Sequence, residues 1–270
     1  MSTPDDTPRP VERRGDPVLH TEDLTIRYGG VVANTAVSLA VHPGEVVGLI
    51  GPNGAGKTSF VDAVTGFTAY EGHVYLGGRA VDGLSSHTRR RAGLARTWQA
   101  GELFDQLTVA QNLELVLEPG GLRAALRDTF APRRSRRDVR AQVAEVLEMT
   151  ELTEVAERLP SELSLGMQKL VGVARAVAGR STVVLLDEPA AGLSSAESQE
   201  FGRSLAKFLE HGIAILMIDH DMELMMNYCH HLYVLNFGKL IAEGTPQAVS
   251  RDTAVVEAYL GATHEGVGAP

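Results

Sequence analysis

The chain has very little cysteine. Of its 270 residues only one is a cysteine, Cys229. A single thiol excludes an internal disulfide, and a chain without disulfides fits a reducing compartment. Cys229 lies in an apolar segment, so we expect it to pack in the core and to take no part in chemistry.

Long apolar runs are also absent. The longest uninterrupted ones, such as Ile213–Ile218, have the length of a strand and fall far short of the ~20 residues that span a bilayer. The N-terminal segment Met1–Asp16 is rich in Pro, Asp, Thr and Arg and lacks the apolar core of a signal peptide, so it is predicted to be a disordered tail. Any membrane function must therefore come through a partner.

Positive charge is scarce overall, with a formal net charge of -9. An acidic chain gives no reason to expect nucleic acid as a partner, and a site for phosphate must be made positive locally. With 44% hydrophobic and 22% charged residues the composition is that of an ordinary globular protein with a sizeable core. The length allows one large domain or two small ones.

The most informative stretch is a buried-strand pattern, Val46–Ile50, that runs directly into the glycine-rich segment Gly51–Ser59. This segment matches G-x-x-x-x-G-K-[ST], the P-loop pattern, in which glycines let backbone N–H groups surround phosphates. Lys57 would reach the β- and γ-phosphates, and Thr58 would offer its hydroxyl to Mg²⁺. A strand–turn–helix connection that only resembles the pattern is the less favoured alternative. The predicted phosphate-binding residues are Gly51, Asn53, Gly54, Ala55, Gly56, Lys57, Thr58 and Ser59.

The segments around the P-loop carry different periodicities. Alternating apolar and polar residues in Leu19–Val41 predict antiparallel strands around a Gly29-Gly30 turn, and Tyr70–Val81 predicts another hairpin. From Ala92 to Gly179 the strand signals stop and helical spacing takes over, which predicts an inserted helical subdomain at about 92–179. The expected organisation is an N-terminal tail over 1–17, one domain over 18–260 and a C-terminal tail over 261–270.

Two further apolar runs, Thr182–Leu186 and Ile213–Ile218, are typical of strands buried on both faces of a parallel sheet. The first ends in Asp187-Glu188 and the second in Asp219-His220. Because ligands bind at the carboxyl ends of strands in open α/β sheets, we expect these polar residues and the P-loop to meet in one crevice. There Asp187 can hold Mg²⁺ and Glu188 can polarise an attacking water, a pair that favours hydrolysis over binding alone.

Five segments follow one another in an order and at separations that resemble the nucleotide-binding subunit of ATP-binding cassette (ABC) transporters. They are the P-loop, Gln99 within Arg96–Gln99, Leu163–Met167, Val183–Glu188 and His220. The resemblance covers nearly the whole chain, from about Leu19 to Leu260. It implies an α/β fold, namely a P-loop NTPase (RecA-like) core with an N-terminal antiparallel β-subdomain and an inserted α-helical signature subdomain.

The resemblance also implies roles for single residues, with ATP and Mg²⁺ as cofactors. Tyr28 would stack on adenine through its π-face. Gln99 would link Mg²⁺ or the attacking water to the helical subdomain. His220 would contact the γ-phosphate and orient the water beside Glu188, a task suited to a side chain that can donate from either nitrogen.

By the same resemblance, Ser164 and Gly166 precede a helix and form a second anion site, which faces ATP held by another subunit. The active unit would be a head-to-tail homodimer or heterodimer around two ATP molecules. The implied partners are integral-membrane permease subunits and, indirectly, an extracytoplasmic solute-binding protein, while no nucleic acid is expected. The chain would be cytoplasmic and peripherally attached to the inner face of the cell membrane through the permease subunits.

Two places depart from the family's pattern. The usual signature is Leu-Ser-Gly-Gly-Gln, and here Leu165 and Met167 replace the first Gly and the Gln, which removes polar support unless Gln168 supplies it. Ser194 stands where an Asp is common, at a position that concerns coupling between subunits. The Arg-rich piece Pro119–Arg137 allows two interpretations, a solvated surface excursion or a binder of lipid headgroups.

Within the family, several segments resemble the ATPases of branched-chain and other hydrophobic amino-acid uptake systems. They are Ile50–Gly56, Ala92–Gln99, Glu188–Leu193, His220–Glu223 and Ala258–Gly261. The expected function is therefore ATP hydrolysis that powers such uptake. The alternatives are the ATPase of a lipid or lipopolysaccharide exporter and, less favoured by the acidic charge, a soluble ABC ATPase that acts on nucleic acid or in regulation.

Overall fold

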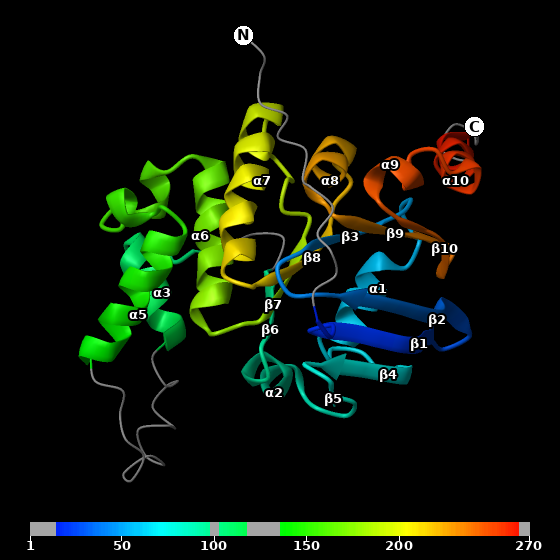
Figure 1. Ribbon diagram of the computed structural model, residues 1–270, viewed down its shortest axis with the longest axis horizontal. Coiled ribbons are helices and arrows are strands. Elements are labelled where there is room, and N and C mark those ends of the chain that lie inside the picture. The colour runs from blue at the N-terminus through cyan, green and yellow to red at the C-terminus, as the bar shows by residue number, and fades with distance from the viewer. Residues whose placement is uncertain (1–14, 98–102, 118–135, 265–270) are drawn as a thin grey trace.

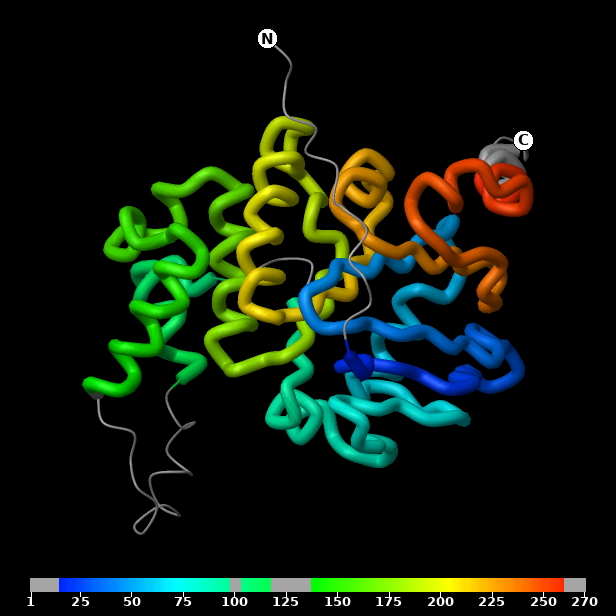
Figure 2. The backbone as a smooth tube through the Cα atoms, viewed as in Figure 1, coloured from blue at the N-terminus to red at the C-terminus, as the bar shows by residue number. Residues whose placement is uncertain are grey.

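The computed structural model describes residues 15–97, 103–117 and 136–264, which form two β-sheets and a set of helices (Figures 1 and 2). Gln99, most of the Arg-rich piece and nearly all of the predicted N-terminal tail lie outside these residues. No helix within the described ranges has both the length and the apolar character needed to cross a bilayer.

The first sheet is antiparallel, with strand order β2-β1-β4-β5. Its strands are β1 (Leu19–Tyr28), β2 (Val31–Val41), β4 (Glu71–Leu76) and β5 (Arg79–Ala80). Alternate residues such as Leu24, Ile26 and Val37 are fully buried, as expected for strands that present one apolar face to a core. The two antiparallel hairpins predicted from the sequence are confirmed.

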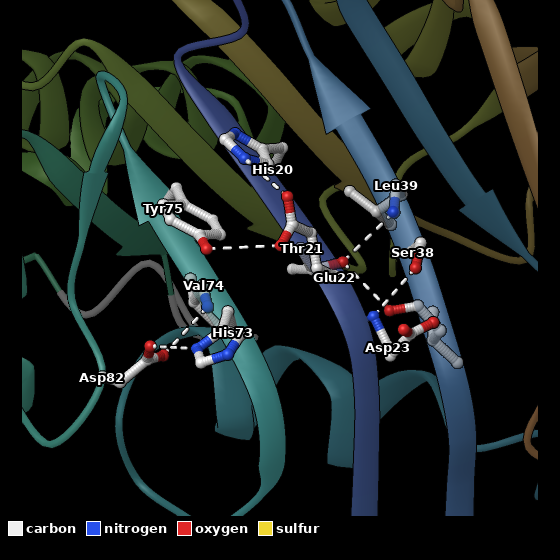
Figure 3. A network of polar contacts seen from close by, with 11 residues as sticks. His20, Thr21, Glu22, Asp23, Ser38, Leu39, His73, Val74, Tyr75 and Asp82 are labelled. Atoms are coloured by element: carbon white, nitrogen blue, oxygen red, sulfur yellow. Dashed lines mark hydrogen bonds and ion pairs between the residues drawn. The ribbon is translucent and has the colours of Figure 1, made fainter.

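The polar residues on β1 and β4 form a network (Figure 3). His73 Nδ1 lies 2.9 Å from Asp82 Oδ2, and the Tyr75 hydroxyl donates to Glu22 Oε2 at 3.2 Å. The His20 ring stacks on Tyr75, with ring centroids 4.3 Å apart. These cross-strand pairs fix the register of the strands.

The second sheet has strand order β10-β9-β3-β8-β7-β6. Its strands are β3 (Val46–Ile50), β6 (Leu94–Thr97), β7 (Val183–Asp187), β8 (Ala214–Ile218), β9 (His231–Asn236) and β10 (Lys239–Gly244). All pair in parallel except β10, which pairs with β9 in antiparallel fashion. Every residue of β3, β7 and β8 is buried, which explains their uninterrupted apolar sequences.

One prediction about this sheet is wrong. The strand signals do not stop at Ala92, because Leu94–Thr97 forms β6 and pairs with β7 from Leu94↔Val183 to Thr97↔Leu186. The strand has only four residues, and Arg96 and Thr97 interrupt its apolar pattern, so its periodicity was too short to recognise. The described helices α3, α5 and α6 therefore follow an edge strand of the central sheet.

Helices cover both faces of the second sheet. Within the described ranges they are α1 (Lys57–Val64), α2 (Ser86–Arg91), α3 (Val109–Leu117), α5 (Arg136–Met149), α6 (Leu165–Ala178), α7 (Ser195–Glu210), α8 (Met222–Tyr228), α9 (Pro246–Val249) and α10 (Thr253–His264). Helix α10 extends four residues past Leu260, the boundary predicted from the sequence. Helix α5 is amphipathic, because Val139, Val143, Val146 and Leu147 at helical spacing are buried.

Alternate residues of β3 point into two separate core clusters. Val46 and Ile50 belong to the hydrophobic cluster that includes residues of α3, α5, α6 and α7, whereas Val47 and Leu49 belong to the cluster that includes residues of α1 and the antiparallel sheet. In Figure 1 the green helices α3, α5 and α6 accordingly stand apart from the blue strands β1 and β2. Helices α1 and α6 therefore lie on opposite faces of the central sheet.

Candidate active site

The P-loop links β3 to α1 and needs glycine at defined points. Gly56 is the residue before α1 and has φ 101°, and a Cβ there would lie 2.5 Å from the carbonyl oxygen of Ala33. A Cβ on Gly51, at φ 149°, would lie 2.0 Å from the carbonyl oxygen of Leu235. Only residues without a side chain let the loop pass between these two neighbours. The loop is thus shaped by close backbone contacts.

The turn between β9 and β10 forms a backbone hydrogen bond with the P-loop. The Gly238 N–H donates to the Ala55 carbonyl at 3.0 Å, and the Gly238 carbonyl accepts from Thr35 N–H at 2.8 Å. From α10, Tyr259 forms a hydrogen bond with the backbone of Gly51, while burial raises the pKa of the Tyr259 hydroxyl. Sequence reasoning missed this support, because the partners lie far apart along the chain.

Lys57 is folded back onto the loop. Its Nζ donates to the carbonyl oxygens of Gly51 at 2.6 Å and Pro52 at 2.9 Å. Burial lowers the pKa of Lys57, and the negative charges of Glu188 and Asp187 oppose that shift. The ammonium group therefore faces the two carboxylates predicted to act in hydrolysis.

The other predicted phosphate-binding residues differ in their exposure to solvent. Asn53, Gly54 and Thr58 are exposed, Ser59 is partly buried in the first turn of α1, and Ala55 is buried. Backbone N–H groups at a helix start, together with the helix dipole, favour an anion. This edge of the sheet is therefore shaped to bind phosphate.

Asp187 and Glu188 stand at the end of β7. Asp187 is 9% exposed, and Glu188 adopts φ 49°, a left-handed conformation that is rare for a non-glycine residue. The Glu188 N–H donates to the Ile218 carbonyl at 2.7 Å, which ties the end of β7 to the end of β8. Because β3, β8 and β7 are parallel neighbours, the predicted meeting of the P-loop, these carboxylates and His220 at one edge is confirmed.

Asp219 organises the loops around that edge, a role that the sequence did not indicate. Its side chain is fully buried, and its Oδ2 accepts from Ala190 N–H at 2.8 Å. Its Oδ1 accepts from the N–H groups of His220 at 2.7 Å and Asp221 at 3.0 Å. One carboxylate thus joins the loop after Glu188 to the loop of His220, whose own side chain is 72% exposed.

Ser164 caps the start of α6, where its Oγ accepts from Met167 N–H at 3.3 Å. The N–H of Gly166 forms a hydrogen bond with Glu197 of α7, and this bond contributes to a lowered pKa of that carboxyl, after the larger effect of its hydrogen bonds with Ser194. Gln168 uses its Nε2 to donate to the Leu163 carbonyl at 3.1 Å. The helix start therefore already receives a carboxylate from the neighbouring helix.

Ser194, the second departure from the family's pattern, has a local task. It is the N-cap of α7, its Oγ accepts from Glu197 N–H at 3.4 Å, and Glu197 Oε2 in turn accepts from Ser194 N–H at 3.0 Å. This reciprocal capping box satisfies two backbone donors. Tyr28, the predicted adenine platform, is 47% exposed at the end of β1.

The donor set at the sheet edge fits a nucleotide-bound Mg²⁺. Within the described ranges, no group of three His, Cys, Asp or Glu side chains is placed to hold a metal ion alone. A carboxylate at Asp187 and a hydroxyl at Thr58 suit Mg²⁺, which keeps few protein ligands and shares the rest of its shell with phosphate and water. The glycine-lined cradle beside Lys57 is placed to bind the phosphates that the nucleotide supplies.

Comparison with known families supports this assignment. The family described as ABC transporter matches residues 35–191, more than half of the chain, and the family described as branched-chain amino acid ATP-binding cassette transporter matches residues 239–265. The second match begins at the first residue of β10 and covers β10, α9 and α10. The general ABC transporter match thus covers the P-loop and the carboxylates at the end of β7, while the branched-chain match covers the C-terminal segment.

Curated relatives are similar over nearly their whole length. The high-affinity branched-chain amino acid transport ATP-binding protein BraF of Pseudomonas aeruginosa is 39% identical over 91% of this chain and 98% of the relative. The lipopolysaccharide export system ATP-binding protein LptB of Haemophilus influenzae is 32% identical over 90% of this chain and 97% of its own length. Similarity therefore extends to both an amino-acid transport protein and an export protein.

Solved structures agree with the fold. A nucleotide-free ATP-binding cassette from an ABC transporter has a TM-score of 0.76 and 30% identity, with 90% of this chain and 98% of that chain covered. An ATP-binding cassette of an ABC transporter in its ADP conformation has a TM-score of 0.77 and 29% identity, with 92% and 100% covered. The predicted P-loop NTPase fold with an antiparallel β-subdomain is confirmed.

Proposed function

We propose that this chain, which belongs to the ABC transporter family of ATP-binding proteins, powers the uptake of branched-chain or related small amino acids through a membrane permease. The family hydrolyses ATP, and the site described above contains the groups which that reaction needs. The N-terminal antiparallel sheet, the P-loop and the carboxylates at the end of β7 support an ATPase with the usual order of parts.

In the proposed reaction, Lys57 and the P-loop N–H groups bind the phosphates of ATP, and Tyr28 stacks on adenine. Thr58, Asp187 and Gln99 would hold Mg²⁺, whose chemistry when bound is to offset the negative charge of the phosphates. Glu188 polarises the attacking water, and His220 donates a hydrogen bond to the γ-phosphate. The anchoring of both loops by Asp219 keeps Glu188 and His220 in place.

The active unit is proposed to be a dimer, homomeric or heteromeric, and one observation carries this proposal. Helix α1, which follows the P-loop, and helix α6, which Ser164 and Gly166 begin, pack on opposite faces of the central sheet. The predicted anion site at the start of α6 and the P-loop therefore belong to different layers of the molecule. A second copy arranged head to tail would bring its own Ser164 and Gly166 to the first copy's ATP.

The permease is proposed to dock in a groove beside the active site. A cavity of about 460 Å³ lies between the end of α1, α2, β6 and helices α3 and α6, and its lining includes Phe67, Arg90, Phe104 and Arg175. Phe67 and Phe104 are 56% and 53% exposed, and the guanidinium of Arg175 lies 5.6 Å from the Phe104 ring centre. Exposed aromatic and arginine side chains are the usual anchors of protein interfaces.

Two residues that line this groove lie close to Gln99 in the sequence. Thr97 and Phe104 line the cavity and flank residues 98–102 in the chain. A permease helix in the groove could therefore respond to the nucleotide state through Gln99. Such attachment would hold the chain at the inner face of the cell membrane, with an extracytoplasmic solute-binding protein as an indirect partner.

The ATPase and the dimer are tested with Glu188→Gln. This variant should bind ATP as the parent does, nearly lose turnover and form an ATP-dependent dimer that persists in size-exclusion chromatography. Lys57→Ala should lose nucleotide binding. The matched control is Glu200→Gln, which makes the same change on the exposed face of α7 and should leave turnover and dimerisation as in the parent. Undiminished hydrolysis by Glu188→Gln would remove that residue from its role.

The substrate is tested by reconstitution. The chain is combined in vesicles with the permease and solute-binding proteins of a branched-chain amino-acid uptake system, and ATP-dependent uptake of leucine, isoleucine and valine is measured. Uptake supports the proposal. Export of lipid or lipopolysaccharide in place of uptake would favour the function of the LptB relative instead.

A further inference from the structure

Arg96 connects three parts of the active site. It lies on β6, and its side chain is only 7% exposed. Its Nη1 donates to Asp62 Oδ1 at 2.6 Å, and its Nη2 donates to Asp187 Oδ2 at 2.7 Å. One guanidinium group thus joins the helix after the P-loop to the carboxylate at the end of β7.

The two carboxylates differ in their surroundings. Asp187 has an 11% exposed side chain, whereas that of Asp62 is 31% exposed. A buried ion pair interacts more strongly than an exposed one, because water screens it less. Arg96 also keeps its charge at any accessible pH. Asp187 therefore carries a permanent positive neighbour in addition to Lys57, whose charge also interacts with this carboxylate.

We propose that Arg96 is a positioning residue that acts as a built-in counter-cation for Asp187 and weakens the hold of the protein on divalent metal. The proposal rests on the proposed function only in its assignment of Asp187 as the carboxylate that holds Mg²⁺. A positive charge paired with that carboxylate opposes the approach of a divalent cation. Metal retention then depends on the phosphates of the nucleotide, so that metal leaves when the nucleotide leaves.

The hydrogen bond from Arg96 to Asp62 holds the guanidinium group near Asp187. Asp62 lies on α1, one turn after Thr58, and it keeps the guanidinium at the site even when Asp187 engages another cation. A guanidinium can serve both carboxylates at once because its donors form a planar fork. The competing explanation is that Arg96 only clamps β6 to α1 and has no influence on the metal.

The two explanations differ in a binding measurement that needs no turnover. The dissociation constant of a fluorescent ADP analogue is measured in EDTA and in Mg²⁺. The ratio of the constant in EDTA to the constant in Mg²⁺ reports how much the metal strengthens nucleotide binding. We expect Arg96→Met to raise this ratio about tenfold, because loss of the charge weakens metal-free binding of phosphate and favours the metal. Arg96→Lys keeps the charge but not the planar fork that reaches both carboxylates, so its ratio should rise by less than about threefold.

Two further variants complete the design. Arg91→Met removes an equal charge from an exposed position on α2 and should leave the ratio unchanged. Asp62→Asn keeps Arg96 but removes its second carboxylate, so it should lower the ratio at least about twofold. This opposite sign keeps the proposal testable even if Arg96→Met does not fold.

A ratio that is unchanged in both Arg96→Met and Asp62→Asn, with lower thermal stability, would overturn the proposal in favour of a clamp. A tenfold rise in Arg96→Lys as well would also overturn it, because the charge would then not be the cause. The proposed transport function has a separate readout, since failure to hydrolyse ATP or to drive uptake leaves this ratio measurable.

Discussion

Asp219→Asn tests whether one buried carboxylate holds the two catalytic loops together. The change keeps the shape of the side chain but replaces one acceptor oxygen with an NH₂ group, which cannot accept a hydrogen bond. Asp219 accepts three backbone N–H groups, from Ala190, His220 and Asp221, at 2.7–3.0 Å. Asparagine can satisfy the last two with its oxygen, and its NH₂ group then faces the Ala190 N–H.

The magnitude follows from these contacts. A buried N–H left without a partner costs about 1–3 kcal/mol, and exchange of a charged acceptor for a neutral one in the other two bonds costs about 0.5–1 kcal/mol each. The free energy of unfolding should therefore fall by about 2–5 kcal/mol. In a protein of this size that corresponds to a decrease in Tm of about 5–10 °C. The loop after Glu188 would lose its bond to the His220 loop.

The assay combines thermal unfolding with steady-state ATP hydrolysis. We expect kcat to fall at least about tenfold, because Glu188 and His220 are no longer held in register, while nucleotide binding at the P-loop stays close to that of the parent. The control is Asp252→Asn. Asp252 Oδ1 accepts from the N–H groups of Ala254 and Val255 at the start of α10, a capping position where asparagine serves equally well.

Two results would refute this reasoning. If Asp219→Asn kept the Tm and kcat of the parent, the carboxylate would not be the joint between the loops. If kcat were unchanged while Tm fell, the joint would stabilise the fold without positioning Glu188 or His220.

Three further predictions follow from other contacts. Arg89 is 2% exposed and donates to the carbonyls of Ala63, Val64 and Leu84, so Arg89→Met should lower the free energy of unfolding by about 3 kcal/mol or more in a denaturant titration. The hydrogen bond with Asp82 raises the pKa of His73 (Figure 3). The pair therefore stabilises the fold fully below the unfolded pKa of 6.5, and this stabilisation is lost as pH rises through the higher folded pKa. The Tm difference between the parent and His73→Asn should shrink from about pH 6 to about pH 9. Gly56→Ala should abolish nucleotide binding in a fluorescence titration, because its Cβ would lie 2.5 Å from the Ala33 carbonyl oxygen, whereas Gly54→Ala, where no atom lies within 4 Å, should retain more of it despite the positive φ.

Local signals made much of the fold predictable. The P-loop, the continuous apolar strands β3, β7 and β8 and the two hairpins are each encoded within ten or so neighbouring residues. Such patterns depend on backbone conformation and burial, which are properties of a single segment. The four-residue strand β6 lacked that signal, because half of it carries the polar residues Arg96 and Thr97.

The layer of residues behind the site could not be predicted in this way. Arg96 reaches Asp62 across 34 positions of the chain and Asp187 across 91, and Asp219 reaches Ala190 across 29. An arginine in a strand or an aspartate before a histidine has no periodicity that names its partner. These contacts exist because parallel strands that are far apart in the chain lie side by side in the sheet.

Ser194 and Met167, which depart from the family's motifs, both take part in helix caps. A comparison of motifs treats Ser194 as the loss of an aspartate, but serine and aspartate are equivalent as N-caps, and Ser194 forms a full capping box with Glu197. The Met167 N–H is satisfied by Ser164, so its missing side-chain polarity leaves the helix start intact. Glu197 also bonds to Gly166, so the cap of α7 and the anion site of α6 share one carboxylate. In the proposed head-to-tail dimer, a phosphate from the second copy would compete with Glu197 for that N–H.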